Sequence, residues 1–525
     1  MREPPGAARA GRAMAVATLV SRITGFLRTL ALVAALGLGT RLFDAYTAAN
    51  TLPNSIYDLV LGGALTGVLV PLLVRHTDEL YAQRLLSLTV YGLGAVVVVT
   101  ALFAPQIVDV CFYGFDTGQR QAAITLTRFF LPQILLYGAG AIVAGVLSTR
   151  GKPAAPMWAP VANNLVVIAT AAAYLAIGGT GRLDTLTGAQ TWLLGVGTSA
   201  GVAVQLLALS LATRGTGFRM RLRADPRGVG IRRIAAMAGW TLLSVVAAQA
   251  VIVVVNQLAS ASAPGALGVY ANAYTLFQLP YAVITVSIVT GVLPRLSQAA
   301  SRRDLAQVTA DLSQSLRLSS VALLPTAAAL VVLGPRITTV LFAHGNADPS
   351  AAALTGSVLA AYGVALVPFC GYQIMLRGFY ALQDTRTPAL IGLLVSGIAI
   401  VGAVLSARLL PGPEMVVGTA AGYAVAYVAG FAVAALVLRR RIGRVDGHRL
   451  LRSHGRMTVA ALAAGAATAV VAHLAGNMAG SGWAGSLVVV LAGGSCGALL
   501  YALAARSLRI AEFRVLVGAL RPGEL

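Results

Sequence analysis

Long hydrophobic runs, separated by short polar segments, fill most of the 525-residue sequence. A helix of about 20 apolar residues can cross the ~30 Å hydrocarbon core of a bilayer. The pattern predicts fourteen such helices, and therefore an all-α polytopic membrane protein. The approximate limits of the runs are 13–39, 44–74, 85–111, 122–149, 156–178, 191–213, 234–260, 266–294, 312–342, 351–381, 388–410, 415–438, 457–475 and 483–505.

Two segments of the second half resemble segments of the first half. GVLSTRGKPAAP at 145–156 closes the fourth run, and GFYALQDTRTPAL at 378–390 closes the tenth. In the same way, TLPNSIYDLVLGGALTGVLVP at 51–71 is matched loosely by QLPYAVITVSIVTGVLP at 278–294. Each pair lies six runs apart, which predicts two parallel six-helix lobes followed by two further helices. Paired bundles favour a transporter with alternating access over a channel.

Positive charge lies mostly on one side of this predicted topology. The chain has 39 Lys and Arg against 17 Asp and Glu, a net charge of +22. If the N-terminus is cytoplasmic, 29 basic residues fall in cytoplasmic segments and five fall in outer loops. Those five are Arg41, Arg120, Arg182, Arg336 and Arg408, the last two of which lie at the outer ends of the runs 312–342 and 388–410. The asymmetry predicts a cytoplasmic-membrane protein with both termini inside, and it explains the basic charge without nucleic acid.

The topology divides the chain into lobes, linkers and tails. The predicted segments are a cytoplasmic N-tail at 1–12, an N-lobe of six helices at 13–213, a basic linker at 214–233, a C-lobe of six helices at 234–438, a basic loop at 439–456, two further helices at 457–505 and a cytoplasmic C-tail at 506–525.

Two arginines lie inside the first hydrophobic run. Arg22 and Arg28 are six residues apart, about 9 Å along a helix. Arg22 is close enough to the cytoplasmic end for its side chain to snorkel to the interface. Arg28 is deeper, where facing lipid costs at least ~2.5 kcal/mol, so we expect it to face an aqueous or anion-binding interior. A guanidinium group binds phosphate oxygens through two parallel hydrogen bonds, which makes a phosphate a suitable partner.

The other polar residues within the runs carry weaker predictions. Asp44, at the start of the second run, either caps its helix or acts as a counter-charge for the arginines. Interhelical hydrogen bonding is the commoner role for Asn163 and Asn164. Snorkelling is preferred for the remaining membrane arginines, Arg128, Arg317 and Arg377. Further cavity candidates are Asn50, Tyr57, Asp58, Asn256 and Asn272.

The first two runs resemble a known family. SRITGFLRTLALVAALGLGTRLFDAYTAANTLPNSIYDLVLGGALTGVLVPLL at 21–73 is similar to the opening helices of the MviN/MurJ family, the lipid II flippases of the multidrug/oligosaccharidyl-lipid/polysaccharide exporter superfamily. The S-R-x-x-G-F-x-R, D-A-[FY] and L-P-N elements stand in order. Two later segments match the family as well, VITVSIVTGVLPRLS at 283–297 and GFYALQDTRTP at 378–388. The sequence of the second run resembles actinobacterial members of the family.

The resemblance implies a substrate and a site. It implies that undecaprenyl-diphosphate-linked disaccharide pentapeptide moves from the inner to the outer leaflet, with its polyprenyl tail in a groove bordered by the last two helices. Arg22, Arg28 and Asp44 fall on family positions associated with transport, and the diphosphate would bind the two arginines. Gram-negative members carry further charges where this chain has Tyr57 or Asp58 and Gly62, and an arginine where it has Ala273 to Thr275. The implied cavity is therefore less cationic here.

Other functions stay open at this stage. One alternative is a flippase for another polyprenyl-linked saccharide, or a multidrug exporter of the same superfamily. A remote alternative is an intramembrane polyprenyl-phosphate glycosyltransferase, an enzyme that would need clustered acidic or histidine side chains. We expect no catalytic or metal site, because Cys111, Cys370 and Cys496 lie far apart and the histidines form no ligand pattern.

The expected partners follow from the proposed substrate. They are lipid II, membrane lipids and the machinery of cell-wall synthesis and division. The sequence has no P-loop, so we expect no cofactor and no ATP hydrolysis in this chain. The membrane potential or a Na⁺ or H⁺ gradient remains as the energy source.

Overall fold

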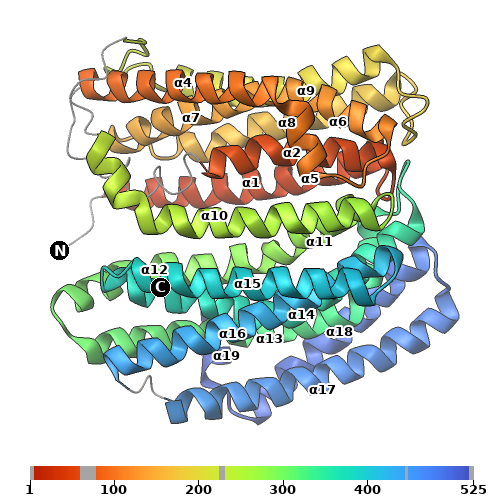
Figure 1. Cartoon of the computed structure of the whole chain (residues 1–525). Coiled ribbons are helices and arrows are strands. Elements are labelled where there is room, and N and C mark those ends of the chain that lie inside the picture. Colours follow the sequence, from red (N-terminus) through yellow and green to blue (C-terminus); the bar gives the residue numbers. More distant parts are fainter. Residues whose placement is uncertain (1–4, 60–78, 224–230, 444–446, 520–525) are drawn as a thin grey trace. The chain divides into compact units, whose positions relative to one another are not determined.

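The computed structural model describes residues 5–59, 79–223, 231–443 and 447–519 (Figure 1). Within these residues, 13 helices are long and apolar enough to cross a membrane. They coincide with thirteen of the fourteen predicted runs, which confirms the all-α membrane fold. The remaining run, 44–74, is described only as far as Leu59, and its second half lies outside the described residues.

The first compact unit comprises residues 1–249 and 344–348. Within it α1 packs against α8, α2 against α6, α4 against α7, and α9 against both α7 and α8. Its helices are α1 (Pro5–Leu36), α2 (Arg41–Tyr57), α4 (Glu79–Leu102), α5 (Ala104–Cys111), α6 (Thr117–Phe130), α7 (Pro132–Thr149), α8 (Ala155–Ala176) and α9 (Gly188–Ala212), coloured red to yellow in Figure 1. The helix α10 (Ile231–Ser262) continues from this unit into the next one, with the division after Gln249.

The second compact unit comprises residues 250–343 and 349–525. α14 packs against α11, α13 and α16, while α17 and α18 pack against each other and against α13. After α10 the elements are α11 (Ala266–Pro280), the π-helix η3 (Tyr281–Thr285), α12 (Val286–Ser301), α13 (Leu305–Phe342), α14 (Pro349–Ala381), α15 (Arg386–Leu409), the 3₁₀ turn η4 (Gly412–Glu414), α16 (Met415–Ile442), α17 (Gly447–Ala479), α18 (Trp483–Ser507) and α19 (Ala511–Ala519).

The helix neighbours repeat from one unit to the other. The pairs α8–α9, α7–α9, α4–α7 and α2–α6 correspond to α15–α16, α14–α16, α13–α14 and α11–α14. The same turn also follows α7 and α14: Gly151 and Gln383 both have a left-handed backbone, with φ of 78° and 60°. This repeated plan agrees with the predicted duplication of a six-helix bundle. The predicted limits of the lobes stay predictions, and the division between the compact units lies within α10.

A charged side chain fixes each of the two equivalent turns, a lysine in the first unit and an aspartate in the second. In the first unit, Lys152 donates from Nζ to the carbonyls of Ala212 (3.0 Å) and Arg214 (2.7 Å) at the end of α9. In the second unit the turn carries an acid, Asp384, which forms an ion pair with Arg441 at the end of α16. A cation at a helix C-terminus is favourable because the helix dipole is negative there. Both turns are therefore tied to the last helix of the same bundle.

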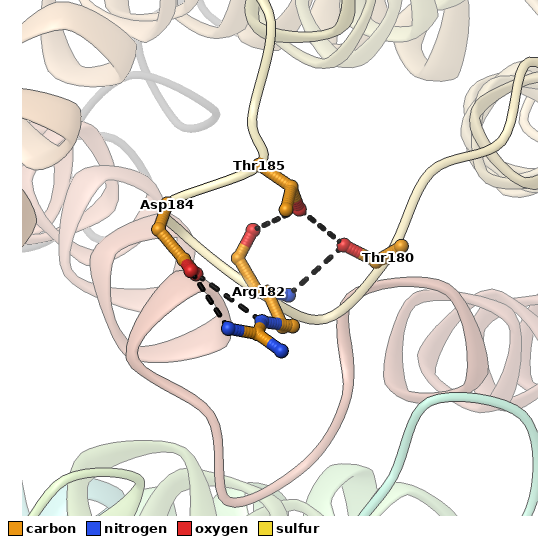
Figure 2. A network of polar contacts seen from close by, with 4 residues as sticks. All are labelled: Thr180, Arg182, Asp184 and Thr185. Atoms are coloured by element: carbon orange, nitrogen blue, oxygen red, sulfur yellow. Dashed lines mark hydrogen bonds and ion pairs between the residues drawn. The ribbon is translucent and has the colours of Figure 1, made fainter.

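A polar network orders the loop between α8 and α9, as Figure 2 shows. The guanidinium of Arg182 donates from Nη2 to Asp184 at 2.8 Å. The hydroxyl oxygens of Thr180 and Thr185 lie 2.6 Å apart, and Thr185 donates to the carbonyl of Arg182 at 3.2 Å. These contacts tie the side chains of the loop to one another and to its backbone.

Arg317 of α13 forms an ion pair that the sequence did not predict. We predicted that it snorkels to the membrane surface, but its Nη1 donates to Glu512 of α19 at 2.7 Å. The side chain of Arg317 is 17% exposed and that of Glu512 is 9% exposed. Arg317 therefore has a carboxylate partner that the sequence did not reveal, and its snorkelling role stays a prediction.

Candidate functional site

The charged part of α1 is held against α8 by one asparagine. Asn164 donates from Nδ2 to the carbonyl of Ser21 (3.3 Å) and to the hydroxyl of Thr24 (3.1 Å). A Cβ atom on Gly25 would lie 3.4 Å from the same Nδ2, so the glycine allows α8 to approach. These contacts involve Ser21, Thr24 and Gly25, beside and between the two arginines in the sequence, and they hold this part of α1 against α8. Interhelical hydrogen bonding by Asn164 is confirmed.

Arg28 combines partial burial with unused hydrogen-bonding capacity. Its side chain is half-buried, and its Nε atom is buried without a hydrogen-bond partner among the described residues. The guanidinium interacts electrostatically with the hydroxyl groups of Tyr46 and Tyr137. A buried donor on a charged group costs free energy unless it is satisfied, so the position favours an anionic or water partner. Arg22 is also half-buried, one and a half turns closer to the N-terminus.

A chain of polar side chains leads away from Arg28 through Tyr46 and Tyr137 inside the first unit. The Tyr46 hydroxyl lies 2.8 Å from Thr198 Oγ1, which ties α2 to α9. Asn163 donates from Nδ2 to Gln205 at 3.1 Å, which ties α8 to α9 and confirms its interhelical role. Sequence reasoning missed Tyr137 and Thr198, because single tyrosine and threonine residues in apolar runs give no periodic signal. These residues form a hydroxyl-rich wall in a medium of low dielectric.

Asp44 is almost fully buried, with 1% of its surface exposed, in the first turn of α2. It does not cap the helix, because the N-cap is Thr40, whose hydroxyl accepts from the backbone N–H of Phe43 at 3.1 Å. The capping alternative for Asp44 is therefore wrong. A carboxylate in the first turn is favoured by the positive end of the helix dipole.

Among the weaker candidates in the first unit, Tyr57 has the most suitable position. It lines a cavity of about 150 Å³ together with Tyr137, and the two ring centroids are 5.8 Å apart. It is therefore joined to the polar chain through a neighbour of Arg28. Asp58 is exposed at the C-cap of α2. Asn50 is half-buried, and its backbone carbonyl accepts from the Asn54 side chain at 2.8 Å.

The two candidates of the second half, Asn256 and Asn272, belong to the second unit. Asn272 donates its amide to the carbonyl of Gly268 in its own helix at 2.8 Å. That donor is therefore already used within α11. Asn256 is buried in α10, with 9% of its surface exposed. Within the first unit, the structure brings Arg28 and Tyr57 into one polar environment through Tyr137.

No metal centre accompanies this site. Across residues 5–59, 79–223, 231–443 and 447–519, no group of three or more His, Cys, Asp or Glu side chains could hold a metal ion. What the arrangement offers instead is a guanidinium with a spare donor, hydroxyl groups and a buried carboxylate. Such a set can bind and orient an anion that itself arrives with a hydrophobic anchor.

Comparison with known proteins gives the family. A family model described as lipid II flippase MurJ matches residues 32–491. The chain belongs to the MurJ family of lipid II flippases. These flippases are transporters, which agrees with the prediction that the chain is not an enzyme. The match begins after Arg28, so the roles of Arg22 and Arg28 stay predictions.

Curated MurJ proteins are similar over most of their length. The chain is 28% identical to the probable lipid II flippase MurJ of Rhizobium meliloti (strain 1021), over 71% of this chain and 70% of the relative. It is also 28% identical to the lipid II flippase MurJ of Burkholderia cenocepacia, over 72% of this chain and 73% of the relative.

Solved structures share the fold. A lipid II flippase MurJ in an inward closed conformation matches with a TM-score of 0.75 at 19% identity, covering 94% of this chain and 99% of the other. An inward-facing multidrug resistance MATE transporter of the MOP superfamily matches with a TM-score of 0.67 at 15% identity, covering 81% and 96%. The MurJ fold is therefore as the sequence resemblance implied.

Proposed function

We infer that this chain is a lipid II flippase, a transporter that moves the undecaprenyl-diphosphate-linked peptidoglycan precursor from the inner to the outer leaflet of a bacterial cytoplasmic membrane. Family membership and relatives named MurJ support the function. The observation within the molecule that carries it is Arg28, a membrane-embedded guanidinium whose buried Nε has no partner among the described residues. A diphosphate supplies the missing acceptor, and its polyprenyl chain brings that acceptor to membrane depth.

In this mechanism the two arginines of α1 act in sequence along one helix. Arg22 is nearer the cytoplasmic end and receives the diphosphate first, while Arg28 holds it about 9 Å deeper. Tyr46 and Tyr137 add hydroxyl donors beside Arg28. Alternating access then moves this site from one face of the membrane to the other.

Asp44 has the properties of a counter-charge. When no substrate is bound, a buried carboxylate lowers the cost of keeping guanidinium groups in the membrane. When the diphosphate arrives, two anions compete for the same cations, and this repulsion favours release after transport. The proposal requires Asp44 to remain ionised inside the first unit.

We place both termini in the cytoplasm, on the basis of the distribution of basic residues. The contacts of the outer loops support this orientation. Three of the five predicted outer arginines form ion pairs with nearby acids: Arg41 with Asp116 (3.2 Å), Arg120 with Asp109 (2.8 Å) and Arg182 with Asp184 (2.8 Å). Paired arginines leave these loops with little net positive charge, whereas most cytoplasmic arginines lie in basic clusters.

A groove in the second unit is a suitable place for the polyprenyl chain. Pro325 and Ala329 of α13, Gly465 of α17 and Gly497 of α18 border a cavity of about 200 Å³ that small residues line. Small side chains leave room for a hydrocarbon chain between packed helices. The resemblance to the family implied such a groove beside the last two helices, which in this structure are α17 and α18.

The energy source and protein partners belong to this proposal as well. We expect coupling to the membrane potential or to a Na⁺ or H⁺ gradient, and contact with the machinery of cell-wall synthesis and division. A flippase for another polyprenyl-linked saccharide would use the same arginines, so the substrate must be tested directly.

Genetic rescue tests the function. Bacterial cells depleted of their own lipid II flippase should grow when they express this chain at normal membrane abundance. Lysis of those cells, with the chain correctly inserted, would contradict the assignment. Rescue of a strain that lacks a different polyprenyl-saccharide flippase, without rescue of the first strain, would favour the alternative substrate.

A further inference from the structure

A second cationic pocket lies wholly within the second unit. It is a cavity of about 130 Å³ between η3, α12 and α14, much larger than the ~10–15 Å³ that one water requires. Gln373 and Arg377, one turn apart on α14, form a polar wall. Tyr281 and Thr285, at the two ends of η3, form another. The third wall is apolar and is formed by Val286, Val289 and Leu293 of α12.

The pocket exists because the eighth span changes from α-helix to π-helix. Pro280 cannot donate a backbone hydrogen bond, and its ring crowds the carbonyl one turn earlier. Residues Tyr281–Thr285 therefore wind as a π-helix, in which the N–H of Val286 bonds the carbonyl of Tyr281. A π-helical turn displaces the helix and widens the space beside it, and such turns are frequent at functional sites.

Arg377 lines this cavity with part of its hydrogen-bonding capacity unused. Its Nε atom is buried and has no hydrogen-bond partner in the part of the chain that the structure describes. Its guanidinium lies over the ring of Tyr380, at 5.9 Å from the centroid, and interacts with Tyr281. The guanidinium is therefore fixed beside the cavity with a donor left over. Snorkelling to the cytoplasmic interface stays a prediction for Arg377.

Because the fold is duplicated, Gln373 and Arg377 can be compared with the corresponding residues of the first unit. Gly151 after α7 corresponds to Gln383 after α14, and counting back equally from both turns aligns Gln373 with Ala141 and Arg377 with Gly145. The first unit thus has two small residues where the second unit has an amide and a guanidinium. The shared fold does not require polar groups at these positions, so their presence calls for a functional explanation.

We propose that the Arg377 pocket binds the phosphate or diphosphate headgroup of a membrane lipid on the cytoplasmic side of the second unit. Arg377 lies four residues, about 6 Å, before the end of α14, which the proposed topology places at the cytoplasmic surface. Lipid phosphates lie at that depth. The guanidinium and the amide of Gln373 supply donors to the anion, while Val289 and Leu293 contact the start of its hydrocarbon chain.

The proposal deepens the lipid II flippase assignment, on which the identity of the lipid rests. In lipid II the headgroup is a diphosphate, and in an anionic phospholipid it is a single phosphate. The sequence lacks the arginine that Gram-negative relatives are implied to have near Ala273 to Thr275. Arg377 restores a cation to the second unit from a different helix, α14 in place of α11.

Binding to the full chain in neutral phosphatidylcholine nanodiscs tests this pocket. The probes are labelled lipid II, phosphatidylglycerol and, as competitor, inorganic pyrophosphate. Arg377→Gln removes the charge, and Arg377→Lys keeps the charge without the planar fork. Thr290→Glu places a carboxylate at the exposed rim of the same cavity, with Thr290→Gln as its neutral match. Arg128→Gln, at an exposed position near the end of α6, controls for the loss of any membrane-edge arginine.

Arg377→Gln should weaken lipid II binding roughly 10- to 100-fold, since hydrogen bonds to a charged group are lost. Thr290→Glu should weaken it as well, Arg377→Lys should be intermediate, and the two controls should bind like wild type. A loss for lipid II alone assigns the pocket to the diphosphate, and a loss for both lipids assigns it to phospholipid headgroups generally.

Two outcomes separate the pocket from the proposed function. If wild type binds lipid II, and folded Arg377→Gln and Thr290→Glu bind both lipids equally well, the pocket is overturned and the flippase assignment stands. If wild type does not bind lipid II but binds phosphatidylglycerol through Arg377, the assignment is overturned and the pocket stands. Should Arg377→Gln unfold, the comparison of Thr290→Glu with Thr290→Gln decides in its place.

Discussion

The ion pair between Arg317 and Glu512 should hold the C-terminal helix α19 on α13. The two side chains are 17% and 9% exposed, and the Nη1–Oε1 distance is 2.7 Å. Arg317 already has a buried Nε without a partner among the described residues. Glu512→Gln would therefore leave a largely desolvated guanidinium without a counter-charge.

Breaking a buried ion pair by removing one partner costs about 3–5 kcal/mol. The lower end applies here, because part of Arg317 remains in contact with solvent. A cost of about 3 kcal/mol corresponds to a roughly 100-fold larger population of the state in which α19 is undocked. Neighbouring contacts, such as the 2.7 Å hydrogen bond from Tyr501 to the carbonyl of Val321, keep α18 in place, so we expect local opening only.

Hydrogen exchange of the amides of residues 511–519 measures this opening. Exchange should accelerate roughly 100-fold in Glu512→Gln and recover most of its protection in Arg317→Met/Glu512→Gln, in which no uncompensated charge remains. Glu414→Gln, at an exposed carboxylate in η4, is the matched control and should leave exchange unchanged. Exchange in Glu512→Gln within threefold of wild type would show that the pair contributes as little as an exposed one, and the reasoning from burial would fail.

Two further predictions concern packing and pH. Burial raises the pKa of Asp384, but its hydrogen bonds with Thr387 and its ion pair with Arg441 outweigh this and hold the pKa below its usual range. A lowered folded pKa stabilises the protein above the unfolded pKa of about 3.9. Asp384→Asn should therefore lower the unfolding temperature at pH 7, and the difference from wild type should shrink as pH falls below about 3.9 and through the lowered folded pKa. A difference that does not change with pH would contradict this. A Cβ on Gly195 would lie 2.6 Å from the Phe129 ring, so Gly195→Ala should lower the free energy of unfolding by about 1–3 kcal/mol, measured by thermal or denaturant unfolding. Gly392→Ala, with open space around the added Cβ, is the control and should be neutral or stabilising. Equal effects of the two substitutions would refute the packing argument.

The fold could be predicted from the sequence because the bilayer imposes helix length on each apolar run. The same physics placed Arg28 in the interior, since a lipid-facing guanidinium is costly. Its neighbour Tyr137 could not be found, because an isolated tyrosine in an apolar run looks like any other interfacial or core residue. The three-dimensional arrangement of α1, α2 and α7 brings its hydroxyl to Arg28.

Long-range contacts account for what the sequence could not show. The partner of Arg317, Glu512, lies 195 residues away in the sequence. The cavity beside Arg377 depends on the π-helix that follows Pro280. The capping alternative for Asp44 failed for a local reason, because Thr40 is also a favoured N-cap residue and the helix begins directly after it.

The central claim is that Arg28 binds the diphosphate of lipid II. Its most direct test is the affinity of purified wild type, Arg28→Lys and Arg28→Ala for lipid II in neutral nanodiscs, measured on protein of equal thermal stability. Arg28→Ala should bind roughly 10- to 100-fold more weakly, because charge-assisted hydrogen bonds worth about 1.5–3 kcal/mol are lost, and Arg28→Lys should lie between the two. Wild-type affinity in a folded Arg28→Ala protein would contradict the account.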